Sequence, residues 1–158
     1  MSDSDSVRVA PYDPKVKIVF KKIKTELVGV LGQVPISHKG STALKIAGQG
    51  EIDLYVPVAK KDFNLYLDKL KKFLGEPNSI YDLRRARFLK YLDGIKIEIF
   101  VINRNSPDWK NSLQFENYLK SHLEALRAYE KLKIDHAGQS TQKYYTKKIE
   151  FINEILEK

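Results

Sequence analysis

Two acidic residues, Glu51 and Asp53, stand at alternate positions in the segment EIDLYVPV (51–58). Polar and apolar residues alternate here, which predicts a β-strand with one buried face and places both carboxylates on its other face. Because Mg²⁺ prefers hard oxygen ligands, two carboxylates at this spacing can share one divalent ion or bridge two. The alternative is an exposed strand face whose acids pair with nearby Lys or Arg. We predict a metal site at Glu51 and Asp53.

A third acid, Glu98, lies between Ile97 and Ile99 in the apolar segment IKIEIFVI (95–102). A carboxylate is expensive to bury without a cation or a hydrogen-bond donor. If this segment lies beside the strand of Asp53, Glu98 completes a three-carboxylate metal site with a catalytic role. If it does not, Glu98 is a surface residue on the same side as Lys96.

Gly40 and Ser41 precede the acidic strand. Glycine lets the backbone approach a ligand closely, and Ser41 begins a predicted short helix over 41–47. Its hydroxyl and N–H can therefore contact a phosphate. Phosphate contacts beside metal-binding carboxylates are the parts that phosphoryl and nucleotidyl transfer require.

The chain carries a net charge of +8, which favours anionic ligands. Arg85 and Arg87 lie close to the strand of Glu98, and Arg can bind phosphate in a bidentate manner. The alternative is a solvated strand edge that discourages aggregation. His38 is expected to be a hydrogen-bonded structural residue.

The elements that position these residues follow from periodicity and turn signals. Helices are predicted from Asp13-Pro14 to Gly32 and over 60–75, and Asp93-Gly94 predicts a tight hairpin within 85–102. From residue 108 onward the pattern is helical. We expect a flexible tail over 1–13 and a single α+β domain over 14–158 with one compact core. Its sheet is mixed and mostly antiparallel, with about four strands, flanked by helices and followed by a helical segment over about 108–158.

Several functional classes are excluded by composition. The chain has no cysteine and only three histidines, so a metal site must use oxygen ligands. No apolar stretch approaches the ~20 residues that span a bilayer, and the N-terminus is polar and acidic. We expect a cytoplasmic protein without a membrane partner.

The pattern of Gly40, Ser41, Glu51, Asp53 and Glu98 resembles that of the polymerase-beta-like nucleotidyltransferase superfamily. The wider context, ISHKGSTALKIAGQGEIDLYVPV, resembles the GrpB-like branch of that superfamily. The segments 115–133 and 144–156 are similar to the closing helices of that family, so the resemblance covers about residues 14–156. Three features depart from the family pattern. Glu51 replaces a residue that is usually apolar, ALKIAGQG stands in place of a Val-Pro-Gly-Leu-like turn, and Glu98 stands on a strand that commonly carries histidines.

The resemblance implies a nucleotidyltransferase-like fold. It also implies transfer of a nucleoside monophosphate from an NTP to a hydroxyl acceptor, RNA or a small molecule, with Mg²⁺ or Mn²⁺ as cofactor. Lys120, His122 and Lys148 match family positions and are implied as substrate contacts. The alternative is a catalytically inactive nucleotide- or RNA-binding module on the same fold, which a distant Glu98 would favour. An antitoxin-like partnership with another protein is a third possibility.

Overall fold

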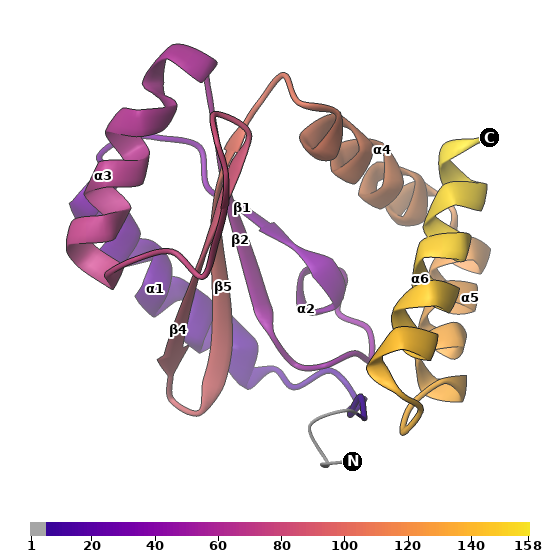
Figure 1. Ribbon diagram of the computed structural model, residues 1–158. Helices are drawn as coiled ribbons and strands as arrows, with labels where there is room; N and C mark the ends of the chain where they lie inside the picture. Colours follow the sequence, from indigo (N-terminus) through magenta and orange to yellow (C-terminus); the bar gives the residue numbers. More distant parts are fainter. Residues whose placement is uncertain (1–5) are drawn as a thin grey trace.

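A computed structural model of the chain describes residues 6–158 (Figure 1). The elements are, in order, α1 (Lys15–Leu31), β1 (Ser37–Lys39), α2 (Gly40–Leu44), β2 (Ile52–Val58), a short 3-10 helix η2 (Lys60–Asp62), α3 (Phe63–Leu74), β3 (Ser79–Tyr81), β4 (Arg85–Leu92), β5 (Ile95–Asn103), α4 (Pro107–Ser121), α5 (Leu123–Asp135) and α6 (Thr141–Leu156). The expected α+β class, with helices around a sheet and a helical C-terminal segment, is confirmed.

The sheet has five strands in the order β1-β2-β5-β4-β3. Within residues 6–158 the β2–β5 pair is the parallel one, and the other three strand pairs are antiparallel. The expected number of about four strands was therefore wrong. The additional strand, β3, is three residues long and lies at the edge of the sheet. A strand this short shows too little alternation to be recognised from sequence.

The hairpin between β4 and β5 turns at Asp93 and Gly94, as expected. Both residues have positive φ angles, 51° and 80°. Positive φ at both central residues is the geometry of the two-residue turn that matches the twist of the flanking strands. The turn sets the register of β4 against β5, in which Leu89 lies opposite Glu98.

Helices α1 and α3 cover one face of the sheet (Figure 1). Alternate residues of β2 point to this face, where Ile52, Leu54 and Val56 are completely buried. The same hydrophobic cluster includes Ile23 and Leu27 of α1, which are one helical turn apart. Glu51 and Asp53 therefore lie on the side of the sheet away from α1 and α3.

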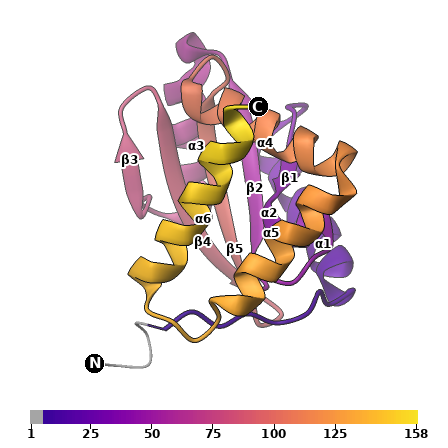
Figure 2. The same cartoon turned by 90° about the vertical axis from the view of Figure 1, so that its right-hand side faces the viewer.

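Helices α4, α5 and α6 lie on that other side of the sheet (Figure 2). They form a separate hydrophobic cluster, to which the loop after α2 contributes Ile46. The expectation of one compact core was wrong. Each helix of this segment buries its apolar stripe against the other two, so the charged face of the sheet needs no apolar cover.

The N-terminal segment is attached to the domain from Ser6 onward. Ala10 pairs with Gly48, and the N–H of Val7 donates a 3.2 Å hydrogen bond to the carbonyl of Gln139. The domain therefore begins earlier than the expected boundary at residue 14. The remainder of the expected tail, residues 1–5, lies outside the described residues. No helix within residues 6–158 is both long enough and apolar enough to span a membrane.

Candidate metal and phosphate site

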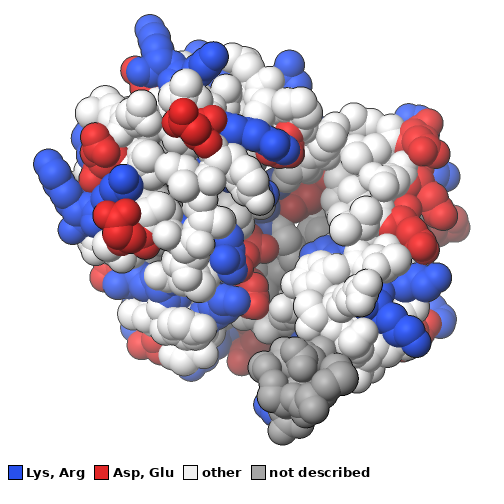
Figure 3. All heavy atoms as spheres, viewed as in Figure 1, with Lys and Arg blue, Asp and Glu red and all other residues white. Residues whose placement is uncertain are grey.

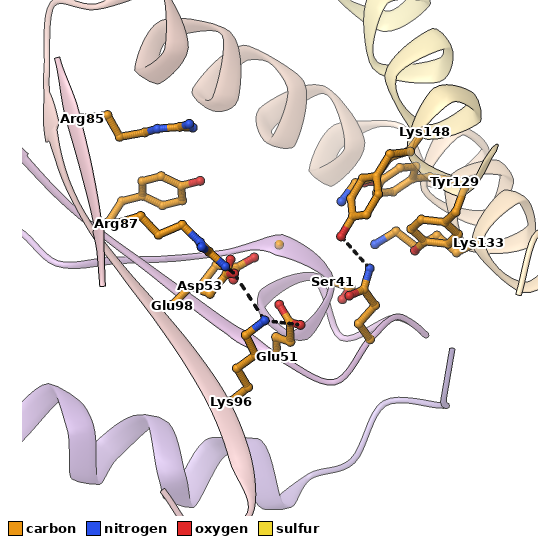
Figure 4. A pocket seen from close by; sticks show the side chains of 15 residues that line it. Ser41, Glu51, Asp53, Arg85, Arg87, Lys96, Glu98, Tyr129, Lys133 and Lys148 are labelled. Carbon is orange, nitrogen blue, oxygen red and sulfur yellow. Dashed lines mark hydrogen bonds and ion pairs between the residues drawn. The ribbon is translucent and has the colours of Figure 1, made fainter. Parts of the chain in front are cut away.

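Three carboxylates converge on the charged face of the sheet. Glu51, Asp53 and Glu98 each offer an oxygen, and these oxygens lie within 4.8 Å of one another. Two backbone features cause this convergence. Side chains along β2 alternate between the two faces of the sheet, and the parallel pairing of β2 with β5 places Asp53 directly opposite Glu98. Figure 4 shows the three side chains together on the sheet side of a cavity. Glu98 therefore does not lie far from Glu51 and Asp53, as the alternative prediction required.

Asp53 is the most perturbed of the three acids. Burial, and then the negative charges of Glu98 and Glu51, raise the pKa of Asp53 to about 8. Burial and the charge of Glu98 also raise the pKa of Glu51. The buried Oδ1 atom of Asp53 has no hydrogen-bond partner among the described residues. Crowded oxygens with an unsatisfied acceptor among them fit a hard divalent cation such as Mg²⁺ or Mn²⁺.

Two cations of the sheet already contact the acids. The guanidinium of Arg87 donates to Oε1 of Glu98, with distances of 2.5 Å from Nη2 and 3.1 Å from Nε. The ammonium of Lys96 lies 3.5 Å from Glu51 Oε1 and 3.8 Å from Glu98 Oε1. These contacts partly neutralise the cluster. They also place Arg87, a predicted phosphate ligand, against a carboxylate.

Gly40 makes room for Asp53. Its φ angle is +83°, and a Cβ atom at this position would lie 2.7 Å from Oδ2 of Asp53. Its backbone N–H donates a 2.7 Å hydrogen bond to Oε2 of Glu116 in α4. The Asp53 carboxylate is therefore the group that lies close to Gly40. The N–H of Gly40 already has an acceptor in Glu116.

Ser41 lines the cavity beside the acids. Gly48 packs against it so tightly that a Cβ atom on Gly48 would overlap its side chain. The hydroxyl of Ser41 is thus held at the cavity wall by a residue of the following loop.

The cavity has a volume of about 450 Å³ and lies between the sheet and the C-terminal helices. Figure 3 shows the corresponding hollow, with charged side chains inside it. Arg85 reaches it from β4, while Lys133 and Lys148 reach it from α5 and α6, opposite the acids (Figure 4).

The two lysines are unusual because they are sheltered without an acidic partner. Lys133 is only 3% exposed and Lys148 is half-buried, yet neither ammonium forms an ion pair within residues 6–158. Burial, followed by repulsion from Lys148, lowers the pKa of Lys133 to about 7. Each ammonium instead lies over a tyrosine ring, that of Lys133 4.4 Å from the centroid of Tyr129 and that of Lys148 5.3 Å from the centroid of Tyr145. Sheltered cations without an acidic partner favour the binding of an anion between them.

Two predicted substrate contacts lie outside the cavity. Lys120 is exposed on the last turn of α4. His122 is exposed at the junction of α4 and α5, where its ring stacks on Tyr118 at a centroid distance of 3.8 Å. The helical pattern does not reveal which helix face turns toward the sheet, so the sequence could not show that these two positions lie outside the cavity.

Lys133 was not among the predicted substrate contacts, although the sequence contains a signal for it. Tyr129 and Lys133 are four residues apart, as are Tyr144 and Lys148, so each pair shares one helix face. Both tyrosines are buried, at 4% and 1% exposure, and both line the cavity. An inward-facing tyrosine therefore marks each lysine as inward-facing.

His38 has the expected structural role. Its Nε2 atom lies 2.9 Å from the hydroxyl of Thr42, which itself donates to the carbonyl of Glu51. The ring stacks on Phe20, and burial lowers the pKa of His38 to about 4. This histidine is neutral near pH 7 and supports the backbone just before the acidic strand.

The fold and the site together define an α+β protein with a carboxylate cluster on its sheet and facing cations on a helical segment. The sequence matches the GrpB protein family over residues 6–158, and the chain belongs to that family. It is 27% identical over 148 residues to a UPF0157 protein of Vibrio cholerae, covering 92% of this chain and 78% of that protein.

A solved structure confirms the architecture. The crystal structure of the conserved protein GrpB from Enterococcus faecalis superimposes with a TM-score of 0.72 at 20% sequence identity. The match covers 94% of this chain and 97% of that chain. At this level of identity the likeness establishes the fold alone.

Proposed function

We propose that this protein is a divalent-metal-dependent nucleotidyltransferase that moves a nucleoside monophosphate from an NTP to a hydroxyl group. The observation that carries the proposal is the charge arrangement of the cavity. Three carboxylate oxygens lie within 4.8 Å of one another on the sheet, and two lysines without acidic partners line the opposite wall. A metal–triphosphate complex presents its cation to the first group and its anionic oxygens to the second.

Each part of the cavity then has a role. Glu51, Asp53 and Glu98 would hold Mg²⁺ or Mn²⁺. When bound, the ion supplies positive charge at the phosphate oxygens during transfer. Lys133 and Lys148 bind the outer phosphates, with Ser41 as a hydrogen-bond donor at the wall. Arg85 also lines the cavity and is not ion-paired within residues 6–158, so its guanidinium is available to a phosphate.

The competing interpretation is an inactive binding module on the same fold. Its support is that Lys96 and Arg87 already neutralise part of the acidic cluster. Against it stands Asp53, whose buried Oδ1 has no hydrogen-bond partner in the described part of the chain. A site that bound only anions would gain nothing from three acids crowded together, because each ionised carboxylate repels phosphate.

The test is pyrophosphate release from each of the four NTPs with Mg²⁺ or Mn²⁺, together with thermal melts. The variant Asp53→Asn keeps the side-chain shape and removes the charge, and the exposed Asp68→Asn in α3 is the matched control. We expect nucleotide to stabilise the wild type and Asp68→Asn only when metal is present, and to stabilise Asp53→Asn weakly or not at all. Equal nucleotide stabilisation with and without metal would support the binding module instead.

A further inference from the structure

A second cavity opens beside the first. It has a volume of about 370 Å³ and lies between the sheet, α4 and α6. Six residues line both cavities: Gly40, Asp53, Tyr55, Arg85, Tyr129 and Lys148. A molecule in the second cavity therefore reaches the same carboxylate, Asp53, that belongs to the metal cluster.

The walls of the second cavity differ in chemistry from those of the first. Apolar surface comes from Phe115 in α4 and from Ile152 and Leu156 in α6. Uncharged polar groups come from Asn111 and Asn153, one on each helix. Charged side chains, among them Lys39, Asp108 and Glu116, also line this cavity. The additional apolar surface suits a small organic molecule that carries polar groups, whereas the first cavity, with its three clustered carboxylates, suits metal and phosphate.

Unsatisfied polar atoms also concentrate here. Among the described residues, the buried side-chain atoms without a hydrogen-bond partner are Asp53 Oδ1, Arg85 Nε and Glu116 Oε1. All three side chains line the second cavity, and of the three only Glu116 does not also line the first. Buried polar groups are rarely left unpaired in a native protein, so such a cluster indicates a missing ligand or water.

Glu116 gives the cluster its specificity. It is 6% exposed, and its Oε2 atom already accepts the hydrogen bond from Gly40. The Lys39 ammonium lies 3.7 Å from Oε1, close enough for charge attraction but too far for a hydrogen bond. Oε1 is therefore ion-paired with Lys39 but accepts no hydrogen bond, and an amino group is a donor that matches a carboxylate.

We propose that the second cavity binds the acceptor, a small molecule that carries both a hydroxyl and an amino group. The proposal rests on the nucleotidyltransferase function proposed above. The amino group binds Glu116, an oxygen of the acceptor accepts from Arg85, and the reacting hydroxyl lies at Asp53.

The reaction balances with these groups alone and the NTP. The hydroxyl oxygen forms a bond to the α-phosphorus, and the bond from that phosphorus to the oxygen bridging to the β-phosphate breaks. Pyrophosphate leaves with that oxygen. The hydroxyl proton is released to solvent water.

The experiment uses amino alcohols as probes and a variant that fills only the second cavity. Asn153→Trp places a large ring in this cavity from an exposed position of α6, away from the metal cluster. Asn117→Trp puts the same ring on an exposed position of α4 that lines neither cavity. Calorimetry with Mg²⁺ compares ethanolamine and glucosamine with glucose, which lacks the amino group, and cyclohexylamine, which lacks the hydroxyl.

We expect the amino alcohols to bind the wild type and Asn117→Trp more tightly than either reference compound, and Asn153→Trp to lose this binding. Stabilisation by Mg²⁺ with NTP should persist in Asn153→Trp, because it depends on the first cavity. If Mg²⁺ with NTP does not stabilise the wild type, the proposed function itself is rejected. Two results would overturn the acceptor proposal. In the first, Asn153→Trp still binds the amino alcohols as tightly as the wild type does. In the second, the wild type binds a short oligoribonucleotide but no amino alcohol, and Asn153→Trp abolishes that binding.

Discussion

The backbone N–H of Gly40 donates a 2.7 Å hydrogen bond to Oε2 of Glu116, a residue 76 positions later in the chain. This bond connects the sheet side of the site directly to α4. Lys39 extends the connection, because its buried ammonium donates a 3.1 Å hydrogen bond to the carbonyl of Ser112 in the same helix. The position of the C-terminal helices is thus coupled to the residue that makes room for Asp53.

The variant Glu116→Gln tests this connection. Glutamine keeps an oxygen for the Gly40 N–H but removes the negative charge beside buried Lys39. Removing one partner of a buried ion pair costs about 3 kcal/mol, so the free energy of unfolding should fall by roughly this amount in urea titrations. The double variant Lys39→Met with Glu116→Gln should recover part of the loss. An unchanged free energy of unfolding in Glu116→Gln would show that the two charges do not interact.

Gly40→Ala should damage both stability and metal binding. The added Cβ would be strained at φ +83° and would meet Oδ2 of Asp53 at 2.7 Å. Gly94→Ala is the matched control, since φ there is +80° and nothing lies within 4 Å. The control should lose about 1–2 kcal/mol from backbone strain alone. In urea titrations with and without Mg²⁺, Gly40→Ala should lose more and gain less from the metal, and equal behaviour of the two variants would disprove the contact.

Stability without metal should depend on pH through Asp53. Its pKa is about 8 in the folded protein against 3.8 for an ordinary aspartate, so the folded state holds this proton more tightly. The stability that this proton contributes is complete below about pH 4 and is lost as the pH rises to about 8. In EDTA, the stability advantage of Asp53→Asn over the wild type should therefore grow between about pH 4 and pH 8 and level off at higher pH. A constant difference would mean that Asp53 is already ionised at pH 5.

Lys133→Met should stabilise the protein while weakening anion binding. A buried ammonium without an acidic partner is replaced by an apolar side chain of similar length, for which a gain of about 1 kcal/mol or more is reasonable. Lys131→Met is the control: Lys131 is exposed on the same helix and pairs with Asp135. Titration with tripolyphosphate should show weaker binding to Lys133→Met only. Unchanged affinity would remove Lys133 from the phosphate site.

Local patterns were sufficient to predict the parts of the fold that depend on neighbouring residues. The alternation in β2 predicted that Glu51 and Asp53 share a face, and Asp93-Gly94 predicted the hairpin. The sequence predicted that Glu98 joins these acids only if its strand lies beside the strand of Asp53. It depends on β2 pairing with β5 in parallel, which is a contact between distant segments that no local pattern encodes.

The helical side of the site was harder to predict for the same reason. A lysine in an amphipathic helix is usually solvated, so nothing in its own residue type separates Lys133 from Lys120. The separation comes from the direction in which α4 and α5 pack, and this direction is fixed by tertiary contacts such as the one between Glu116 and Gly40. In the structure Lys148 lines the cavity, whereas His122 lies at the junction of two helices and is exposed.

The parallel register that pairs Asp53 with Glu98 also has a consequence for how the chain folds. The β4–β5 hairpin turns over two residues, whereas β2 and β5 are separated by a long intervening segment, so we expect β2 to join the hairpin late in folding. That late docking step is also the step that forces the carboxylates together. Repulsion between the carboxylates should therefore raise the free-energy barrier to folding as well as the free energy of the native state. A divalent cation that reaches the chain before docking is complete should accelerate refolding, so the same acids would connect metal supply to the rate at which the native protein forms.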